Sequence, residues 1–161
     1  MEKLWAPWRM AYIKKKNKEK RCIFCRGRQK TAYPKKTYIL AHSKLSYVIL
    51  NKYPYISGHL MVVPKRHVSQ LENLSEKEGT DIFLLVQKTI RILKKALKPQ
   101  GVNVGLNLGK SAGAGITRHL HYHIVPRWQG DTNFMPVVGQ SRVISDSLAN
   151  TYRRLAPYYK R

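Results

Sequence analysis

The 161-residue sequence contains very few acidic residues and only two cysteines. Its 8 Asp and Glu stand against 31 Lys and Arg, which gives a formal net charge of +23 at pH 7. Cys22 and Cys25 are too few to form the framework of a disulfide-rich secreted domain. No apolar run approaches the roughly 18 residues of a membrane span, and the first residues lack the apolar core of a secretory signal. We therefore expect a soluble cytoplasmic protein without a membrane segment.

The excess of positive charge is concentrated near the start of the chain. Residues 1–36 hold 13 basic and two acidic residues, a net charge of +11, and Lys14 to Lys20 is the densest stretch. Such a surface attracts polyanions, which include nucleic acids and nucleotides. We expect residues 1–21 to form a basic arm, which is either a solvated extension or a contact for polyphosphate or nucleic acid.

The length allows one domain, and a hydrophobic fraction of 43% excludes general disorder. Runs rich in β-branched, aromatic and aliphatic residues predict strands over residues 37–40, 45–50, 59–63, 102–108 and 118–125. One helical pattern separates the strand pairs. This order favours an α+β fold with a mainly antiparallel sheet over a doubly wound one.

The helical pattern follows Ser75 and Glu78, which fit a capping box. Apolar residues then recur at helical spacing, at Ile82, Val86, Ile90, Leu93 and Leu97. Pro99 and Gly101 end the pattern. A second short helix is predicted over residues 145–155, with Tyr152 and Leu155 as packing residues.

Three histidines, His119, His121 and His123, alternate with apolar residues. On a strand, alternation places the three imidazoles on one face. Two chemical interpretations follow. Imidazoles at this spacing suit a metal site, and an imidazole nitrogen is also a nucleophile toward phosphorus. A loop rich in glycine and alanine, Gly109 to Gly115, precedes the run, and its amides suit phosphate oxygens.

The histidine run resembles the signature of the histidine triad family of nucleotide hydrolases and transferases. The similarity covers about residues 22–128, because further segments also match: Asn51–Pro54, Gly58–Pro64, His67, Asn107 and Pro126–Arg127. Segments near the two ends of the matched region resemble one branch of the family in particular. Trp5–Arg9, Cys22–Cys25 and residues 127–136 resemble the diadenosine polyphosphate hydrolases and phosphorylases.

The resemblance implies about five antiparallel strands packed by helices and paired in a homodimer. It assigns residues 22–136 to the family domain, with a C-terminal extension over 137–161 that packs on it. The substrate it implies is a dinucleoside polyphosphate such as diadenosine tetraphosphate, cleaved by hydrolysis or phosphorolysis through a nucleotidyl-histidine intermediate.

The resemblance also assigns roles to residues. His121 is the nucleophile, the backbone carbonyl of His119 fixes its tautomer, and His123 and His59 orient the phosphates. The substrate-binding residues it implies are Asn51, Asn107, Gly113, Ala114, Gly115 and Thr117. Many family members carry Gln or Ser where Gly115 stands, so the leaving group is less defined here.

A structural zinc is implied by the same resemblance, with Cys22, Cys25, His67 and His119 as ligands. Two thiolates and two imidazoles suit tetrahedral zinc. Mg²⁺ or Mn²⁺ bound with the substrate is compatible with the chemistry, although no carboxylate cluster marks a site. Two alternative functions stay open: a nucleoside phosphoramidase that cleaves AMP–amine bonds, and a basic protein that binds or deadenylates nucleic acid.

Overall fold

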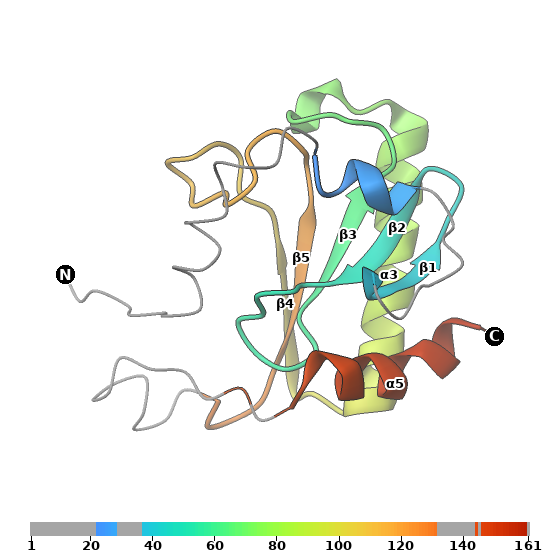
Figure 1. The fold of residues 1–161 in the computed structure, drawn as a ribbon, viewed down its shortest axis with the longest axis vertical. Coiled ribbons are helices and arrows are strands. Elements are labelled where there is room, and N and C mark those ends of the chain that lie inside the picture. Colours follow the sequence, from blue (N-terminus) through green and yellow to red (C-terminus); the bar gives the residue numbers. More distant parts are fainter. Residues whose placement is uncertain (1–21, 29–36, 132–143, 145, 161) are drawn as a thin grey trace.

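A computed structural model describes residues 22–28, 37–131, 144 and 146–160 of the chain (Figure 1). The predicted basic arm, residues 1–21, lies outside the described residues, as does most of the stretch over 132–145. The elements follow in the order η1 (Cys25–Arg28), β1 (Ile39–His42), β2 (Ser46–Leu50), β3 (Leu60–Pro64), η2 (Leu71–Asn73), α3 (Glu76–Leu97), β4 (Gly101–Gly105), β5 (Tyr122–Arg127) and α5 (Leu148–Tyr159).

The strands form one five-stranded sheet in the order β1-β2-β3-β5-β4. Every neighbouring pair is antiparallel. Helix α3 runs along one face of this sheet, and α5 lies across the end of the same layer (Figure 1). The predicted α+β fold with five antiparallel strands is therefore confirmed.

Alternation along the strands divides the buried side chains between the two faces of the sheet. Val48, Leu50 and Val62 pack toward the helices, in a core that also contains Ile82, Val86 and Leu93 of α3 and Leu155 of α5. Tyr47, Met61 and Val63 point to the opposite face, where they meet Phe24. This second face, which α3 does not cover, carries the histidines described below.

The start of α3 confirms the capping box. The Ser75 hydroxyl accepts a hydrogen bond from the Glu78 N–H, and the Glu78 carboxylate accepts one from the Ser75 N–H. Lys98 adopts a left-handed φ of 50° after the last turn. The predicted tail helix corresponds to α5, with Tyr152 and Leu155 buried. No helix in the described ranges has both the length and the apolar character that crossing a bilayer requires.

The bounds of all five strands differ from the predictions, by one residue in β2 and β3 and by two or more residues in β1, β4 and β5. Tyr38 has a φ of 56°, so β1 starts at Ile39 instead of residue 37. Strand β4 ends at Gly105, three residues before the predicted end. Strand β5 starts at Tyr122, and the predicted strand over 118–125 is wrong in its first half. The reason is that the Leu120 N–H donates to the Val68 carbonyl at 2.6 Å, outside the sheet ladder.

Candidate active site and metal cluster

Three histidines form a group on the sheet face opposite α3. His59 immediately precedes β3, His123 lies in β5, and His121 precedes β5 by one residue. The His59 and His123 rings are 5.0 Å apart, and the His121 and His123 rings are 4.9 Å apart. We call His59, His121 and His123 the three-histidine group. His59 and His121 are buried, with 0% and 6% of their surface exposed, so water is largely excluded from them.

The tautomer of His121 is fixed by its own backbone segment. Its Nδ1 lies 2.9 Å from the carbonyl oxygen of His119. A carbonyl only accepts hydrogen bonds, so Nδ1 carries the proton and donates it. In the neutral ring, Nε2 then keeps its lone pair, which is the form that a nucleophilic imidazole needs.

A chain of hydrogen bonds fixes the tautomers of the other two histidines. The backbone N–H of Tyr55 donates to His59 Nδ1 at 3.1 Å, and the Asn51 amide nitrogen lies 3.3 Å from the same atom. Neutral His59 therefore carries its proton on Nε2, which lies 2.9 Å from His123 Nδ1. His123 accepts this bond at Nδ1, so its own proton sits on Nε2 and is free to be donated to a ligand.

All these imidazoles are held in the neutral form. Burial lowers the pKa of His59 to about 3, and the neighbouring His123 and His121 contribute to the shift. Burial, with a contribution from His121, also lowers the pKa of His123 to about 4. The pKa of His121 is lowered by burial and partly restored by the bond to the His119 carbonyl. The tautomers above therefore apply at neutral pH.

A second group of side chains lies beside the first. One ligand atom from each of Cys22, Cys25, His67 and His119 falls within 4.8 Å of the other three. The Cys22 sulfur is 3.3 Å from His119 Nδ1, and the Cys25 sulfur is 3.2 Å from His67 Nδ1. We call these four residues the Cys/His cluster. In the part of the chain that the structure describes, it is the one group of three or more side chains arranged to hold a metal ion.

The donor set of the Cys/His cluster fits zinc. The His119 Nε2–H donates to the Pro64 carbonyl at 2.9 Å, which leaves Nδ1 without a proton and turned toward the two sulfurs. This second hydrogen bond is what metal-binding histidines in proteins usually have. Two sulfurs and two imidazole nitrogens within one small space suit a closed tetrahedral site.

Comparison with known proteins agrees with this geometry. The family profile described as HIT domain matches residues 34–130, more than half of the chain. The chain belongs to the histidine triad (HIT) family. The predicted family is therefore confirmed, and the matched range includes the alternating histidines.

Similar histidine triad proteins have been named by activity. The chain is 42% identical to the protein named AP-4-A phosphorylase from Mycobacterium tuberculosis, over 100% of this chain and 86% of that protein. It is 33% identical to the asymmetrical bis(5'-nucleosyl)-tetraphosphatase of Schizosaccharomyces pombe, over 62% of this chain and 54% of that protein.

Solved structures of histidine triad proteins share the fold. A zinc-bound family protein from Mycobacterium smegmatis aligns with a TM-score of 0.68 at 23% identity, over 86% of this chain and 93% of that one. A histidine triad nucleotide-binding protein from Sulfolobus tokodaii aligns with a TM-score of 0.67 at 26% identity, over 86% and 92%.

Two residues of this histidine triad site were missed by the sequence interpretation. The Phe24 ring lies 5.0 Å from the His121 ring and 5.6 Å from the His119 ring. The Tyr55 ring lies 4.6 Å from the His59 ring. The position of Phe24 between Cys22 and Cys25, two residues of the Cys/His cluster, could have indicated it. Nothing local marked Tyr55, whose contribution includes a backbone N–H.

In the loop from Gly109 to Gly115, two of the N–H groups expected to bind phosphate form hydrogen bonds within the loop. The Gly113 N–H donates to the Lys110 carbonyl at 3.0 Å, and the Ala114 N–H donates to the Gly109 carbonyl at 3.2 Å. These two N–H groups are therefore occupied by hydrogen bonds within the loop and are not available to bind phosphate. Gly113 has a φ of +87°. A Cβ at this glycine would lie 3.8 Å from the Asn107 amide nitrogen, so the loop and Asn107 are neighbours.

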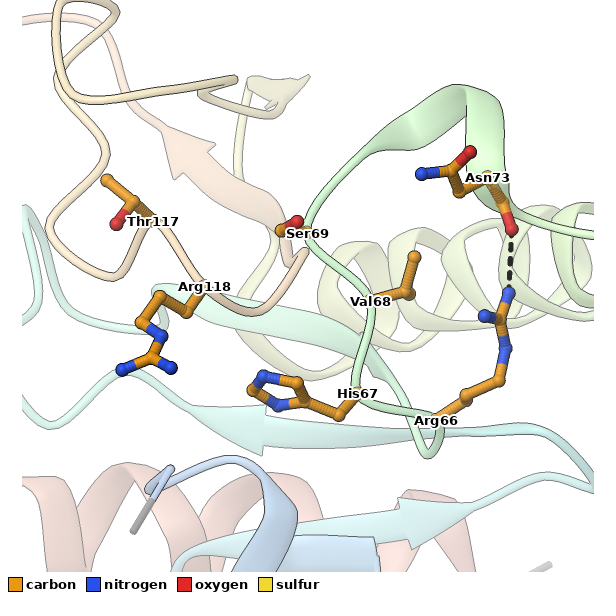
Figure 2. Close-up of a pocket in the computed structure, with 7 residues that line it drawn as sticks. All are labelled: Arg66, His67, Val68, Ser69, Asn73, Thr117 and Arg118. Atoms are coloured by element: carbon orange, nitrogen blue, oxygen red, sulfur yellow. Dashed lines mark hydrogen bonds between the residues drawn. The ribbon is translucent and has the colours of Figure 1, made fainter. Parts of the chain in front are cut away.

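Thr117 faces a different space from the three-histidine group. It lines a cavity of about 580 Å³ between the segment after β3 and the segment before β5 (Figure 2). The other lining residues are Arg66, His67, Val68, Ser69, Asn73 and Arg118. Figure 2 shows Arg66 turned toward the Asn73 carbonyl, to which it donates at 2.7 Å. The cavity therefore borders the Cys/His cluster through His67, and His121 does not line it.

Proposed function

We propose that the protein cleaves dinucleoside polyphosphates, such as diadenosine tetraphosphate, through a covalent nucleotidyl intermediate on His121. The observation that carries this proposal is the hydrogen bond from His121 Nδ1 to the His119 carbonyl, which leaves Nε2 of the neutral ring unprotonated and able to act as a nucleophile. The names of the similar proteins, a phosphorylase and a tetraphosphatase of such dinucleotides, support the same substrate class.

The reaction proceeds in two displacements. His121 Nε2 attacks the α-phosphorus, a P–N bond forms, and the bridging P–O bond breaks to release the remaining nucleoside polyphosphate. An acceptor oxygen then attacks the same phosphorus, the P–N bond breaks, and Nε2 recovers its lone pair. A water acceptor gives a nucleoside monophosphate, and an inorganic phosphate acceptor gives a nucleoside diphosphate. The 42% identity to a protein named as a phosphorylase favours phosphate.

The neighbouring residues stabilise the charge that develops on phosphorus. His123 donates its Nε2–H to a phosphate oxygen, and His59 keeps that proton in place by donating to His123 Nδ1. Asn51 holds His59 and lies next to the nucleotide, and Asn107 binds phosphate from the other side. Mg²⁺ or Mn²⁺ accompanies the polyphosphate as part of the substrate. The net charge of +23 suits a substrate with several negative charges.

A structural zinc held by the Cys/His cluster is also part of the proposal. Zinc would crosslink the segment over 22–25 to His67 and His119, which are distant in sequence. Its chemistry there is structural, since four protein ligands leave no open position for substrate.

We further propose that the protein is a homodimer joined through β4. This strand lies at one edge of the sheet, next to β5 on its other side. Its residues Asn103, Val104 and Gly105 are exposed, and it contains no charged residue or proline that would protect an open edge. Pairing of two such edges would continue the sheet from one chain into the other.

The test is a product analysis of the purified full chain. Diadenosine tetraphosphate is supplied with and without inorganic phosphate, beside an AMP–amine phosphoramidate and a labelled nucleic acid. ATP with ADP, formed only when phosphate is present, is expected; ATP with AMP would identify a hydrolase. His121→Ala should abolish turnover. Full activity of that variant would reject the mechanism. Turnover of the phosphoramidate alone, or tight nucleic-acid binding without turnover, would reject the substrate class.

A further inference from the structure

Phe24 stands between the two cysteines of the Cys/His cluster and touches the proposed nucleophile. Its side chain is 2% exposed, and its ring lies 5.0 Å from the His121 ring. The His123 ring lies 4.9 Å from the same imidazole. Two rings and the hydrogen bond to the His119 carbonyl therefore restrain the orientation of His121. Of these restraints, only Phe24 comes from outside residues 119–123.

The backbone of Phe24 is anchored to the sheet. Its carbonyl accepts the Tyr47 hydroxyl at 2.7 Å and the Gly27 N–H at 3.0 Å. Tyr47 is fully buried, and burial raises its pKa above the ordinary value, so the hydroxyl stays protonated and remains a donor. Ile39, Met61 and Val63 complete the apolar surroundings of the Phe24 ring.

Cys22 and Cys25, which lie before and after Phe24 in the sequence, join its segment to the cluster. The Cys22 sulfur lies 3.3 Å from His119 Nδ1, and the Cys25 sulfur lies 3.2 Å from His67 Nδ1. His119 in turn offers its carbonyl to His121. The cluster thus reaches the three-histidine group by two routes, one through the Phe24 ring and one through the His119 backbone.

We propose that Phe24 is a positioning residue for His121, and that its two flanking cysteines make the orientation of the nucleophile depend on the Cys/His cluster. The proposal deepens the proposed function and rests on it for the role of His121. A metal in this cluster would then hold the ring of Phe24 against the nucleophile as well as crosslink the fold. Misplacement of a reacting atom by about 1 Å can cost on the order of 100-fold in rate, so a ring contact of this kind affects turnover.

The experiment compares Phe24→Leu, Phe24→Ala and Tyr47→Phe with the wild type. Phe24→Leu keeps the site apolar, and Tyr47→Phe keeps the core while removing one of the two hydrogen bonds to the Phe24 carbonyl. We expect kcat to fall about tenfold in Phe24→Leu and about 100-fold in Phe24→Ala, with KM within about twofold of the wild type. Leu155→Ala is the matched control, because it opens a cavity in the other core cluster. It should lower the melting temperature and leave kcat unchanged.

A second measurement does not depend on activity. Nitrogen-15 NMR of the histidine rings should show His121 as a single Nδ1–H tautomer in the wild type and in Leu155→Ala. Phe24→Ala, and the wild type after zinc is removed with a chelator, should both show mixed tautomers. If Phe24→Ala does not fold, Phe24→Leu and Tyr47→Phe decide the question. Wild-type kcat with an unchanged His121 signal in those variants would overturn the proposal.

Failure of the proposed function and failure of the positioning role of Phe24 would give different results. If the wild type does not cleave dinucleotides, or if His121→Ala is fully active, the proposed function fails. The His121 signal still reports whether Phe24 and the cluster orient that ring. If turnover depends on His121 while the Phe24 variants match the wild type in both measurements, only the positioning role is lost.

Discussion

The Nε2 atom of His59 lies 2.9 Å from the Nδ1 atom of His123. Since the Tyr55 N–H already occupies His59 Nδ1, the proton of neutral His59 is on Nε2 and points at His123. This single relationship decides which atom of His123 can donate to a phosphate. In the proposed mechanism, His59 therefore acts on the substrate through His123.

We predict that His59→Phe, which keeps a ring but removes the donor, lowers kcat about 100-fold, as the loss of one transition-state hydrogen bond does. KM should change little, because the effect arises when charge develops on phosphorus. Steady-state kinetics with diadenosine tetraphosphate measure both constants, and a melting curve checks that the variant is folded. A kcat within twofold of the wild type would show that His59 does not control the proton on His123.

Removal of one ligand should empty the Cys/His cluster. We predict that the wild type is purified with about one zinc per chain, and that Cys22→Ser and His67→Ala lose it. Because bound metal stabilises the native state by mass action, their melting temperatures should be lower by about 10 °C.

Atomic absorption measures the zinc in each variant. His42→Ala is the control, since His42 lies in β1 and is not part of the cluster. It should keep the metal. A wild type purified without zinc, and unable to take it up from solution, would contradict the assignment.

The parts of the fold that could be predicted have local signals. The capping box of Ser75 and Glu78 lies within four residues, and the apolar stripe of α3 repeats over a few turns. The proximity of His121 and His123 also follows from their spacing of two residues, and their rings are neighbours although only His123 lies in β5. In each case the residues that make the contact are close in sequence.

The remaining features depend on contacts between distant segments. The Leu120 N–H donates to the Val68 carbonyl outside the sheet ladder, so β5 begins only at Tyr122. His119 precedes the strand, and its Nδ1 lies 3.3 Å from the Cys22 sulfur. Phe24 contacts His121 across almost a hundred residues of sequence. The amides of Gly113 and Ala114 are engaged in turns that glycine content alone does not specify. The four residues of the Cys/His cluster were predicted from the family resemblance, because their spacing in the sequence alone does not group them.

The ion pair between Arg66 and Glu78 makes stability depend on pH. Hydrogen bonds from Arg66, aided by those of Ser75, lower the pKa of Glu78 to about 2 from its ordinary value of 4.5. A carboxylate with a depressed pKa stabilises the folded state above its ordinary pKa, and this contribution is lost as the pH falls toward 2. Glu78→Gln cannot ionise and should lower the melting temperature at pH 7 by about 2–4 °C.

The difference between wild type and Glu78→Gln should shrink between pH 5 and about pH 2, the window set by the two pKa values. Thermal melts across this range measure the difference in melting temperature. The other carboxylates are the same in both proteins, so their contributions cancel when the two are compared. Glu72→Gln, an exposed glutamate in η2, should follow the wild type. A constant difference at all pH values would show that the ionised form of Glu78 is not what stabilises the helix start.

The position of β4 at the edge of the sheet that the structure describes predicts the oligomeric state. Light scattering of the wild type should give twice the mass of one chain. Val104→Lys places a charge on the exposed edge, where lysine is known to block strand pairing, and should shift the protein to monomers. Leu71→Lys, a similar change at an exposed residue of η2, should leave the dimer intact. A monomeric wild type, or an unchanged Val104→Lys dimer, would exclude this interface.

Two glycines of the structure should respond in opposite directions to alanine. A Cβ at Gly27 would lie 2.7 Å from three atoms of the Tyr47 side chain, which is fully buried and has no room to move. Gly27→Ala should therefore cost about 1–3 kcal/mol of unfolding free energy through overpacking. It should also weaken zinc binding, because Tyr47 holds the segment between the cysteines.

Gly79 lies within α3 with open space around it, so Gly79→Ala should stabilise the protein by about 0.5–1 kcal/mol. Urea denaturation measures both changes, and equal shifts in the two variants would show that the contact with Tyr47 does not govern Gly27.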